Sequence, residues 1–162
     1  MNYKKILNDS DYKKLSVLKF CDTTSYGLVF TKVKLSDNLY SHVNMQLCMK
    51  SVNNDTLVML ITSIFSNKVH IQDFKSKFKN FGNGKQILIY FNKIIKELDY
   101  QISYIEGQLS PIDYEYWDKS IYMYSHYIQN NYMLIDNQLS PSEFLSVMKK
   151  YRYCMVNFKL FL

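Results

Sequence analysis

Two glycines separated by a single residue, Gly82 and Gly84, stand directly before an amphipathic run that extends from Lys85 to Leu98. Glycine lets the backbone pass close to a bulky anion, and the first amide groups of a helix have no acceptor within the helix. The helix dipole and nearby lysines, among them Lys79 and Lys85, add positive charge. These features predict a phosphate-binding turn, and therefore a nucleotide-like or coenzyme-like ligand.

The glycine turn does not match the best-known phosphate motifs. No GxxxxGK[ST] pattern passes through Gly82 and Gly84, which excludes a P-loop. Lys85, Gln86 and Ile87 follow where the dinucleotide fingerprint would place its third glycine. The sequence therefore argues against P-loop, kinase and Rossmann-type nucleotide binding, and it leaves a tight structural turn as the alternative.

The residues around this turn include side chains that can move protons. His70 and Asp73 lie in the segment before it, and either can accept a proton from an amine, directly or through water. Glu106 is a third such group. A purely structural role stays open for each of them. No Cys/His cluster has metal-ligand spacing and no Ser-His-Asp set can be assigned, so no metal site and no covalent catalysis are predicted.

The first half of the chain has the composition of β-strands. Apolar, aromatic and β-branched residues gather in four segments, and Asn53-Asn54-Asp55 fits a hairpin turn between the last two. A fifth segment alternates its side chains as it approaches the glycine turn. The predicted strands are Leu15 to Cys21, Gly27 to Leu35, Val43 to Val52, Thr56 to Phe65 and Lys68 to Phe74. Their simplest arrangement is an antiparallel meander.

Helical spacing begins after the glycine turn. Apolar residues recur at helical intervals from Ile87 to Leu98, which predicts a helix of about four turns. A short strand from Tyr100 to Ile105 follows. Strand, helix and strand then form a right-handed crossover between parallel strands, with the anion site at the carboxyl end of the first strand.

The last part of the chain contains two helix starts of the type Ser-Pro. Ser110 and Pro111 begin a helix whose apolar stripe ends near Asn130-Asn131, and Ser140 begins a second helix with a capping box that reaches about Tyr151. The stripe of the first consists of Trp117, Ile121, Tyr124 and Ile128. Strands are predicted at Tyr132 to Ile135 and Tyr153 to Phe161. The fold class is therefore α+β, with a mixed, mostly antiparallel central sheet and one parallel βαβ crossover.

Length and composition indicate one globular domain of 162 residues. The apolar stretches are too short for a membrane span, and the N-terminus lacks the apolar core of a signal peptide. Cys21, Cys48 and Cys154 lie in apolar segments, which predicts reduced, buried thiols and a cytoplasmic protein. The net charge of +6 suits an anionic ligand, but no run of five basic residues occurs, so nucleic acid is a less favoured partner.

In their order, these elements resemble the GNAT (GCN5-related N-acetyltransferase) superfamily, specifically its acetyl-CoA-binding half. The segment from Lys79 to Gly84 stands where that family has an [R/Q]xxGx[G/A] loop, and His126 to Tyr132 is similar to its FYxxxGF-like segment. The resemblance covers about residues 68 to 162. It departs from the family in having lysine at 79, Asn131 in place of a glycine, and no clear pair of amphipathic helices in the N-terminal half.

The resemblance implies acetyl-CoA as co-substrate and direct transfer of its acetyl group to an amine. It also implies that residues 68–162 form the coenzyme-binding half of a single domain, with residues 1–67 on the acceptor side. The implied coenzyme contacts are Gln72, Phe74, Lys79, Gly82, Asn83, Gly84, Lys85 and Gln86. Tyr127 falls at the tyrosine that protonates the departing thiolate in many relatives, and Asp73 or His70 is the implied base.

The acceptor, a small molecule or a protein, is not defined by this resemblance, and the protein is expected to be a monomer or a homodimer. Two other functional classes stay open. One is a catalytically inactive GNAT-fold interaction protein. The other is a basic nucleic-acid-binding module, for which steep salt dependence of binding would be typical.

Overall fold

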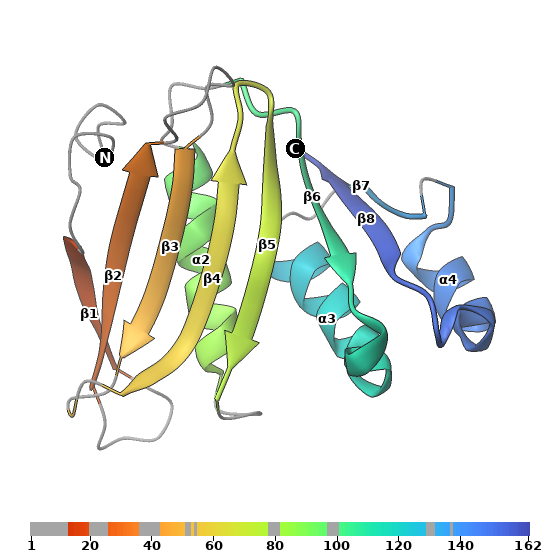
Figure 1. Cartoon of the computed structure of the whole chain (residues 1–162), viewed down its shortest axis with the longest axis horizontal. Coiled ribbons are helices and arrows are strands. Elements are labelled where there is room, and N and C mark those ends of the chain that lie inside the picture. The colour runs from red at the N-terminus through yellow and green to blue at the C-terminus, as the bar shows by residue number, and fades with distance from the viewer. Residues whose placement is uncertain are drawn as a thin grey trace.

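The computed structural model describes residues 13–19, 26–35, 43–50, 53, 55–77, 82–96, 101–128, 132–136 and 138–162. These residues form an eight-stranded sheet in the order β1-β2-β3-β4-β5-β6-β8-β7 (Figure 1). Its strands are β1 (Lys13–Lys19), β2 (Tyr26–Leu35), β3 (Val43–Lys50), β4 (Thr56–Ile64), β5 (Lys68–Ser76), β6 (Tyr104–Leu109), β7 (Tyr132–Ile135) and β8 (Val156–Phe161). The helical segments are α2 (Asn83–Lys96), η1 (Pro111–Tyr116), α3 (Trp117–Met123), η2 (Tyr124–Ile128), α4 (Pro141–Val147) and η3 (Met148–Tyr151).

Strands β1 to β5 form the predicted antiparallel meander, in which each strand pairs with the next. All but one neighbouring pair in the sheet is antiparallel, and the exception joins β5 to β6. The predicted mixed, mostly antiparallel sheet with one parallel crossover is therefore confirmed. The described residues before α2 contain strands and turns, and no helix.

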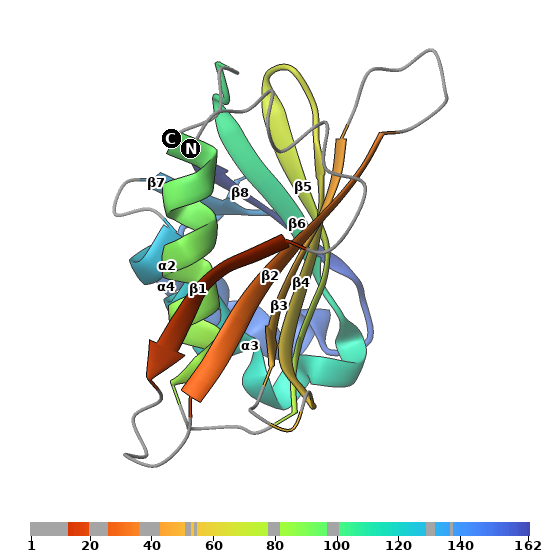
Figure 2. The ribbon, with the colours of Figure 1, turned by 90° about the vertical axis from the view of Figure 1, so that its left-hand side faces the viewer.

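Helix α2 covers one face of the meander, as Figure 2 shows from the side. It packs on β3 and β4 through Ile87, Leu88 and Phe91, which are fully buried against the core of the sheet. The helix begins at Asn83 rather than at the predicted Lys85. Gly82 directly before it has a φ of 72°, a conformation that costs glycine little. The packing of α2 on the sheet and the conformation of Gly82 together fix the position of the helix N-terminus.

The prediction for β6 was wrong in its bounds. The strand runs from Tyr104 to Leu109. The predicted strand, Tyr100 to Ile105, therefore overlaps only the first two residues of β6. Ile105, Gly107 and Leu109 alternate inward and are buried, so the period of two continues through the glycine. Gly107 lies so close to Phe158 on β8 that a Cβ atom there would be 2.7 Å from the ring.

The segment after β6 is helical, as predicted, but it consists of three kinds of helix. The 3-10 helix η1 is capped by Ser110, whose side chain accepts a hydrogen bond from the amide of Ile112. Trp117 at the start of α3 is buried and donates to the carbonyl oxygen of Ser110 at 2.7 Å, which ties the two helices together. The π-helix η2 follows. The predicted apolar stripe is buried throughout, while its predicted end at 130–131 lies outside the described residues.

The last elements are the edge strand β7, helix α4 and strand β8. The predicted capping box of α4 is present, with Ser140 and Glu143 bonded to each other's backbone groups. Strand β8 begins at Val156, not at the predicted Tyr153. Cys48 is buried, but Cys154 is exposed, which corrects the prediction that every thiol is buried; Cys21 lies outside the described residues.

Two features are absent from the described residues. None of the helices there combines the length and the apolar character that crossing a membrane requires. Within the same residues, no group of three or more His, Cys, Asp or Glu side chains is arranged to hold a metal ion.

Candidate functional site

The two parallel strands β5 and β6 pair over only their first three residues. The pairs are Lys68 with Tyr104, Val69 with Ile105 and His70 with Glu106. Beyond these pairs the strands separate, and Figure 1 shows β5 and β6 diverging toward their carboxyl ends. In α/β sheets, ligands bind in the crevice outside the carboxyl ends of parallel strands. The separation therefore opens a cleft at the edge where a ligand is expected.

A cavity of about 1570 Å³ occupies this cleft. Its walls come from β4, from β5 beyond Val69, from the start of α2, and from the end of β6 with the helical segment that follows it. Pockets for drug-sized ligands usually measure roughly 300–1,000 Å³. The cleft therefore has room for a ligand of coenzyme size.

The N-terminus of α2 forms one end of the cavity. Gly82, Asn83, Gly84 and Lys85 all line it, and the amides of the first helical turn have no acceptor within the helix. Among the described residues, the first amide of this helix with a backbone acceptor is that of Gln86, which donates to the carbonyl oxygen of Gly82 at 3.1 Å. This end of the cavity combines amide donors, the positive end of the helix dipole and the cation of Lys85.

Asn83 adds an unusual feature to this end. Its side chain is only 4% exposed, and its Oδ1 atom is fully enclosed without a hydrogen-bond partner. Buried polar atoms are normally hydrogen-bonded, so an unpartnered acceptor is costly unless a bound group supplies a donor. The start of α2, with Lys85 beside it, is consistent with a ligand that carries anionic oxygens.

Gly84 allows two side chains to approach the helix closely. A Cβ atom at this position would lie 3.0 Å from Cε of Met123 and 3.2 Å from Cζ of Phe74. Both neighbours line the cavity beside it. The glycine therefore has a packing role, in addition to any role in binding, and a large side chain here would displace both neighbours into the cavity.

Strand β5 carries a β-bulge where it enters the cavity. Ile71 pairs with Thr62 and Asp73 pairs with Ile61, so Gln72 has no residue opposite it on β4. The side chain of Gln72 donates to Ser63 at 2.7 Å. A bulge removes its residue's backbone groups from the regular ladder and turns them in a new direction. The bulge therefore places Gln72 outside the regular β4–β5 pairing at the cavity wall.

Asp73 and His70 lie at different ends of β5. Asp73 lines the cavity, and its carboxylate forms an ion pair with Nζ of Lys75 at 2.6 Å. The side chain of Lys75 is 71% exposed. His70 is not among the lining residues. Its Nδ1 lies 3.5 Å from Glu106, which also binds Lys68 at 2.9 Å. The hydrogen bond to Glu106 raises the pKa of Lys68. His70 therefore lies beside the Lys68–Glu106 ion pair where the strands are paired, and Asp73 lies in the open cleft.

Tyr127 reaches the cavity from the π-helix η2. It is half-buried, and its ring lies 5.2 Å from Nζ of Lys85 at the start of α2. Short π-helical turns occur frequently at functional sites. The structure thus brings Tyr127 to the helix end that carries the glycine turn, although Tyr127 and Lys85 are 42 positions apart in the sequence.

Tyr124 lines the cavity, whereas from the sequence it was predicted only as a member of the apolar stripe of its helix. Its ring packs on Phe158 at 4.8 Å and on Phe74 at 6.0 Å, and the residue is 6% exposed. Burial raises the pKa of Tyr124, and the charges of Asp113 and Asp73 raise it further. Its hydroxyl therefore keeps its proton at neutral pH.

Asp113 and Lys119 also line the cavity and were not predicted as site residues. From the sequence, only a helix that begins at Ser110 and Pro111 was predicted in this segment. A signal was present, because Asp113 follows β6 by four positions and the carboxyl ends of parallel strands share one edge of a sheet. That signal was hidden by the wrong end assigned to β6.

The predicted site residues are therefore placed as follows. Six of the eight implied coenzyme contacts line the cavity, namely Gln72, Phe74, Gly82, Asn83, Gly84 and Lys85. Gln86 does not line it, and Lys79 lies outside the described residues. Of the three implied catalytic residues, Tyr127 and Asp73 line the cavity and His70 does not.

No protein-family model matches the chain, and no curated protein sequence does. Two solved structures are similar to it in fold. One, described as a "putative acetyltransferase" from Sphaerobacter thermophilus, is 4% identical with a TM-score of 0.45, over 77% of this chain and 69% of that one. The other is a chimera of the spermidine N-acetyltransferase SpeG from Vibrio cholerae and hSSAT. It is 12% identical with a TM-score of 0.38, over 73% of this chain and 65% of that one.

Proposed function

We propose that this protein binds acetyl-CoA in the cleft between β5 and β6 and transfers its acetyl group to an amine. One observation carries this proposal. The parallel strands separate after three pairs, and the resulting cavity is lined together by the start of α2, by the bulged part of β5 and by Tyr127. An anion-binding helix end, a bulged strand and a phenol hydroxyl thus share one cavity.

The cavity residues fit the parts of acetyl-CoA. The amides at the start of α2 and the cation of Lys85 suit the diphosphate. Phe74 and Met123, which lie beside Gly84, offer an apolar surface for the pantetheine arm.

The proposed chemistry uses Asp73 on β5, the backbone at the Gln72 bulge and Tyr127 on η2, all of which line the cavity. Asp73 accepts a proton from the ammonium form of the acceptor, and the lone pair of the resulting amine attacks the thioester carbonyl carbon. A backbone N–H at the Gln72 bulge donates to the carbonyl oxygen as negative charge develops on it. As the carbon–sulfur bond breaks, Tyr127 gives its proton to sulfur. The second proton lost by nitrogen restores Tyr127 through solvent, and the products are an amide and coenzyme A.

Binding is tested by measuring the unfolding temperature of the full chain with acetyl-CoA, coenzyme A or inorganic diphosphate. A ligand that binds only the native state raises this temperature, and the shift grows with the logarithm of the ligand concentration divided by its Kd. In Gly84→Trp, the indole occupies the space beside Phe74 and Met123, so the shift caused by acetyl-CoA should disappear. Gly84→Ala is the matched control, because a methyl group requires Cε of Met123 and the ring of Phe74 to shift by only a few tenths of an ångström. A shift of equal size in Gly84→Trp would refute the ligand assignment.

A charge variant tests the same site without filling it. Lys85→Glu places an anion at the start of α2, and we expect it to weaken binding of acetyl-CoA by about tenfold or more. Lys93→Glu makes the same change on the last turn of that helix, away from the cavity, and should leave the affinity unchanged. Equal affinities in both variants would contradict diphosphate binding at the helix N-terminus. Tight binding without transfer to any amine would overturn the transferase and favour an inactive binding protein.

A further inference from the structure

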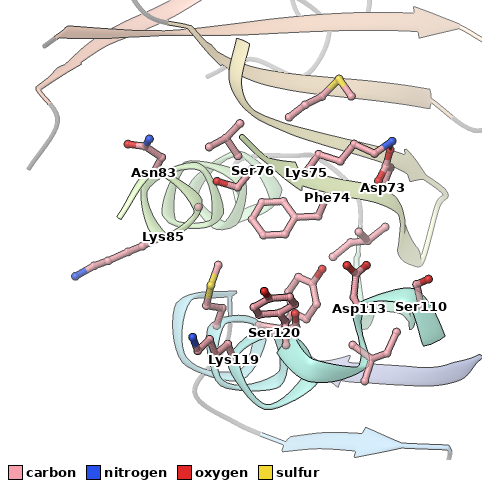
Figure 3. A pocket seen from close by; sticks show the side chains of 18 of the residues that line it. Asp73, Phe74, Lys75, Ser76, Asn83, Lys85, Ser110, Asp113, Lys119 and Ser120 are labelled. Atoms are coloured by element: carbon pink, nitrogen blue, oxygen red, sulfur yellow. Dashed lines mark ion pairs between the residues drawn. The ribbon is translucent and has the colours of Figure 1, made fainter. Parts of the chain in front are cut away.

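The cavity has two ends of opposite charge. Figure 3 shows Asn83 and Lys85 at one end, where α2 begins. Asp73 and Asp113 lie at the other end, and the ring of Phe74 lies between the two groups. A coenzyme bound at the start of α2 therefore points its reactive part toward an acidic region. That region must receive the acceptor.

The two carboxylates come from opposite walls. Asp73 is on β5, and Asp113 is on η1, just after the end of β6. Asp73 has Lys75 as an ion-pair partner, whose side chain is mostly in solvent. Asp113 has no ion-pair partner within the part of the chain that the structure describes. One carboxylate of the pair is thus available to a ligand as it stands.

Tyr124 provides an independent observation at the same place. The residue is 6% exposed and lines the cavity. Its hydroxyl makes no hydrogen bond to any described residue. The fully enclosed polar atoms without a partner are Oδ1 of Asn83 and Oδ1 of Asn92, so the Tyr124 hydroxyl differs from them in having accessible surface. The hydroxyl therefore opens toward the cavity. An almost buried polar group without a partner indicates a ligand atom that hydrogen-bonds to it.

We propose that the acceptor is an aliphatic diamine or longer polyamine, whose amino groups bind between Asp73, Asp113 and the hydroxyl of Tyr124. This inference rests on the proposed function. A reacting amine must be neutral when it attacks, whereas carboxylates favour ammonium ions. Two carboxylates on opposite walls are therefore best explained by two amino groups, one that gives its proton to Asp73 and one that stays charged at Asp113.

Tyr116, three residues after Asp113, gives this part of the cavity an aromatic surface. Tyr116 lines the cavity, and Nζ of Lys119 already lies over its ring at 5.8 Å. Tyrosine rings attract cations through their electron-rich faces. An alkyl chain with ammonium ends can pack its methylene groups on such rings and direct its charges at the carboxylates.

The test is calorimetric titration of the full chain, at saturating coenzyme A, with three probes of similar length. These are 1,4-diaminobutane, 4-amino-1-butanol and 1-aminobutane, which differ in the group at the second end. We expect the diamine to bind at least about tenfold more tightly than the amino alcohol, because only the diamine brings a second charge. Asp113→Asn should abolish that preference. Glu115→Gln removes the same charge two residues away, outside the cavity, and should preserve it.

The outcomes separate this inference from the proposed function. If the diamine and the amino alcohol bind equally, or if Asp113→Asn keeps the preference, the diamine site is wrong while coenzyme binding is unaffected. If coenzyme A does not bind but the Asp113-dependent preference is present without it, the transferase proposal is wrong and the amine site stands. Tyr124→Phe, which removes only the hydroxyl, should weaken diamine binding several-fold; no change would exclude Tyr124 from the site.

Discussion

The two ends of the β5–β6 pair differ in how they use their charged groups. At the paired end, Lys68, His70 and Glu106 bind one another across the strands. At the separated end, Asp113 has no ion-pair partner among the described residues, and the hydroxyl of Tyr124 has no hydrogen bond there. The same two strands thus carry polar groups that satisfy each other at one end and polar groups that are available at the other.

This difference follows from strand geometry rather than from residue type. Side chains on paired strands lie close together and can neutralise one another. Where the strands separate, the distance between the walls leaves room for a ligand to provide the missing partner. Charged residues are therefore most informative about function when their position relative to the point of separation is known.

Tyr127→Phe should produce the largest change at the open end. Loss of a proton donor usually slows a reaction by roughly 10²–10⁴-fold, so release of coenzyme A thiol in the presence of an amine should fall by about that factor. Binding of acetyl-CoA should be unchanged, because the ring and its packing against Lys85 remain. Tyr132→Phe on β7, an exposed tyrosine away from the cavity, is the control. An unchanged rate in Tyr127→Phe would remove the proposed acid.

The elements of the fold could be predicted because their signals are local. The capping box at Ser140, the apolar face of α2 and the stripe through Trp117 each depend on residues within a few turns, and each is confirmed. The end of β6 could not be predicted. Gly107 resembles a strand terminator in sequence, and only its contact with Phe158, far along the chain, explains a glycine inside the strand.

The site was harder to predict for the same physical reason. His70 and Asp73 are separated by two residues on one strand, and nothing in their spacing reveals where β5 leaves β6. Tyr124 was interpreted as core because its spacing fits the apolar stripe, and it is indeed buried. That its hydroxyl opens toward a cavity depends on the π-helical turn and on neighbours from three other elements.

Gly107→Ala should produce the next largest effect. It changes the open end indirectly, through Phe158, which packs on the cavity residue Tyr124. The new methyl group would lie 2.7 Å and 2.8 Å from two carbon atoms of the Phe158 ring. That ring is buried and stacked on Tyr124, so relief of the clash shifts the cavity wall. Overpacking of this kind costs about 1–3 kcal/mol, measurable as a lower urea midpoint. A midpoint equal to that of the unmodified protein would mean that the β6–β8 contact is looser than described.

A change in pH tests whether Tyr124 is as buried as its contacts indicate. Its raised pKa means that the unfolded chain ionises near the ordinary value of 10.0 while the folded chain does not. Stability from this group is therefore complete below that pH and is lost as the pH rises above it. From about pH 9 to about pH 11, the unfolding temperature of Tyr124→Phe should fall less steeply than that of the unmodified protein. Tyr132→Phe should follow the unmodified protein; parallel curves for all three would contradict the burial.

The smallest effect is expected at the paired end, from Glu106→Gln. This change removes the carboxylate that binds Lys68 and approaches His70, and the pKa of Lys68 should return toward its ordinary value. The side chains are partly exposed, so the loss of stability should stay below about 1 kcal/mol. Because neither His70 nor Glu106 lines the cavity, coenzyme binding and turnover should not change.

The matched variant at the open end is Asp73→Asn, which should lower turnover while stability changes little, since its partner Lys75 is mostly in solvent. Denaturation and turnover measured on both variants then separate the two ends of β5. If Glu106→Gln reduced turnover as much as Asp73→Asn, the paired end would have to act on the acceptor. The base would then be sought around His70 and Glu106, where the strands still lie side by side, and the separation of the strands would no longer mark the boundary of the site.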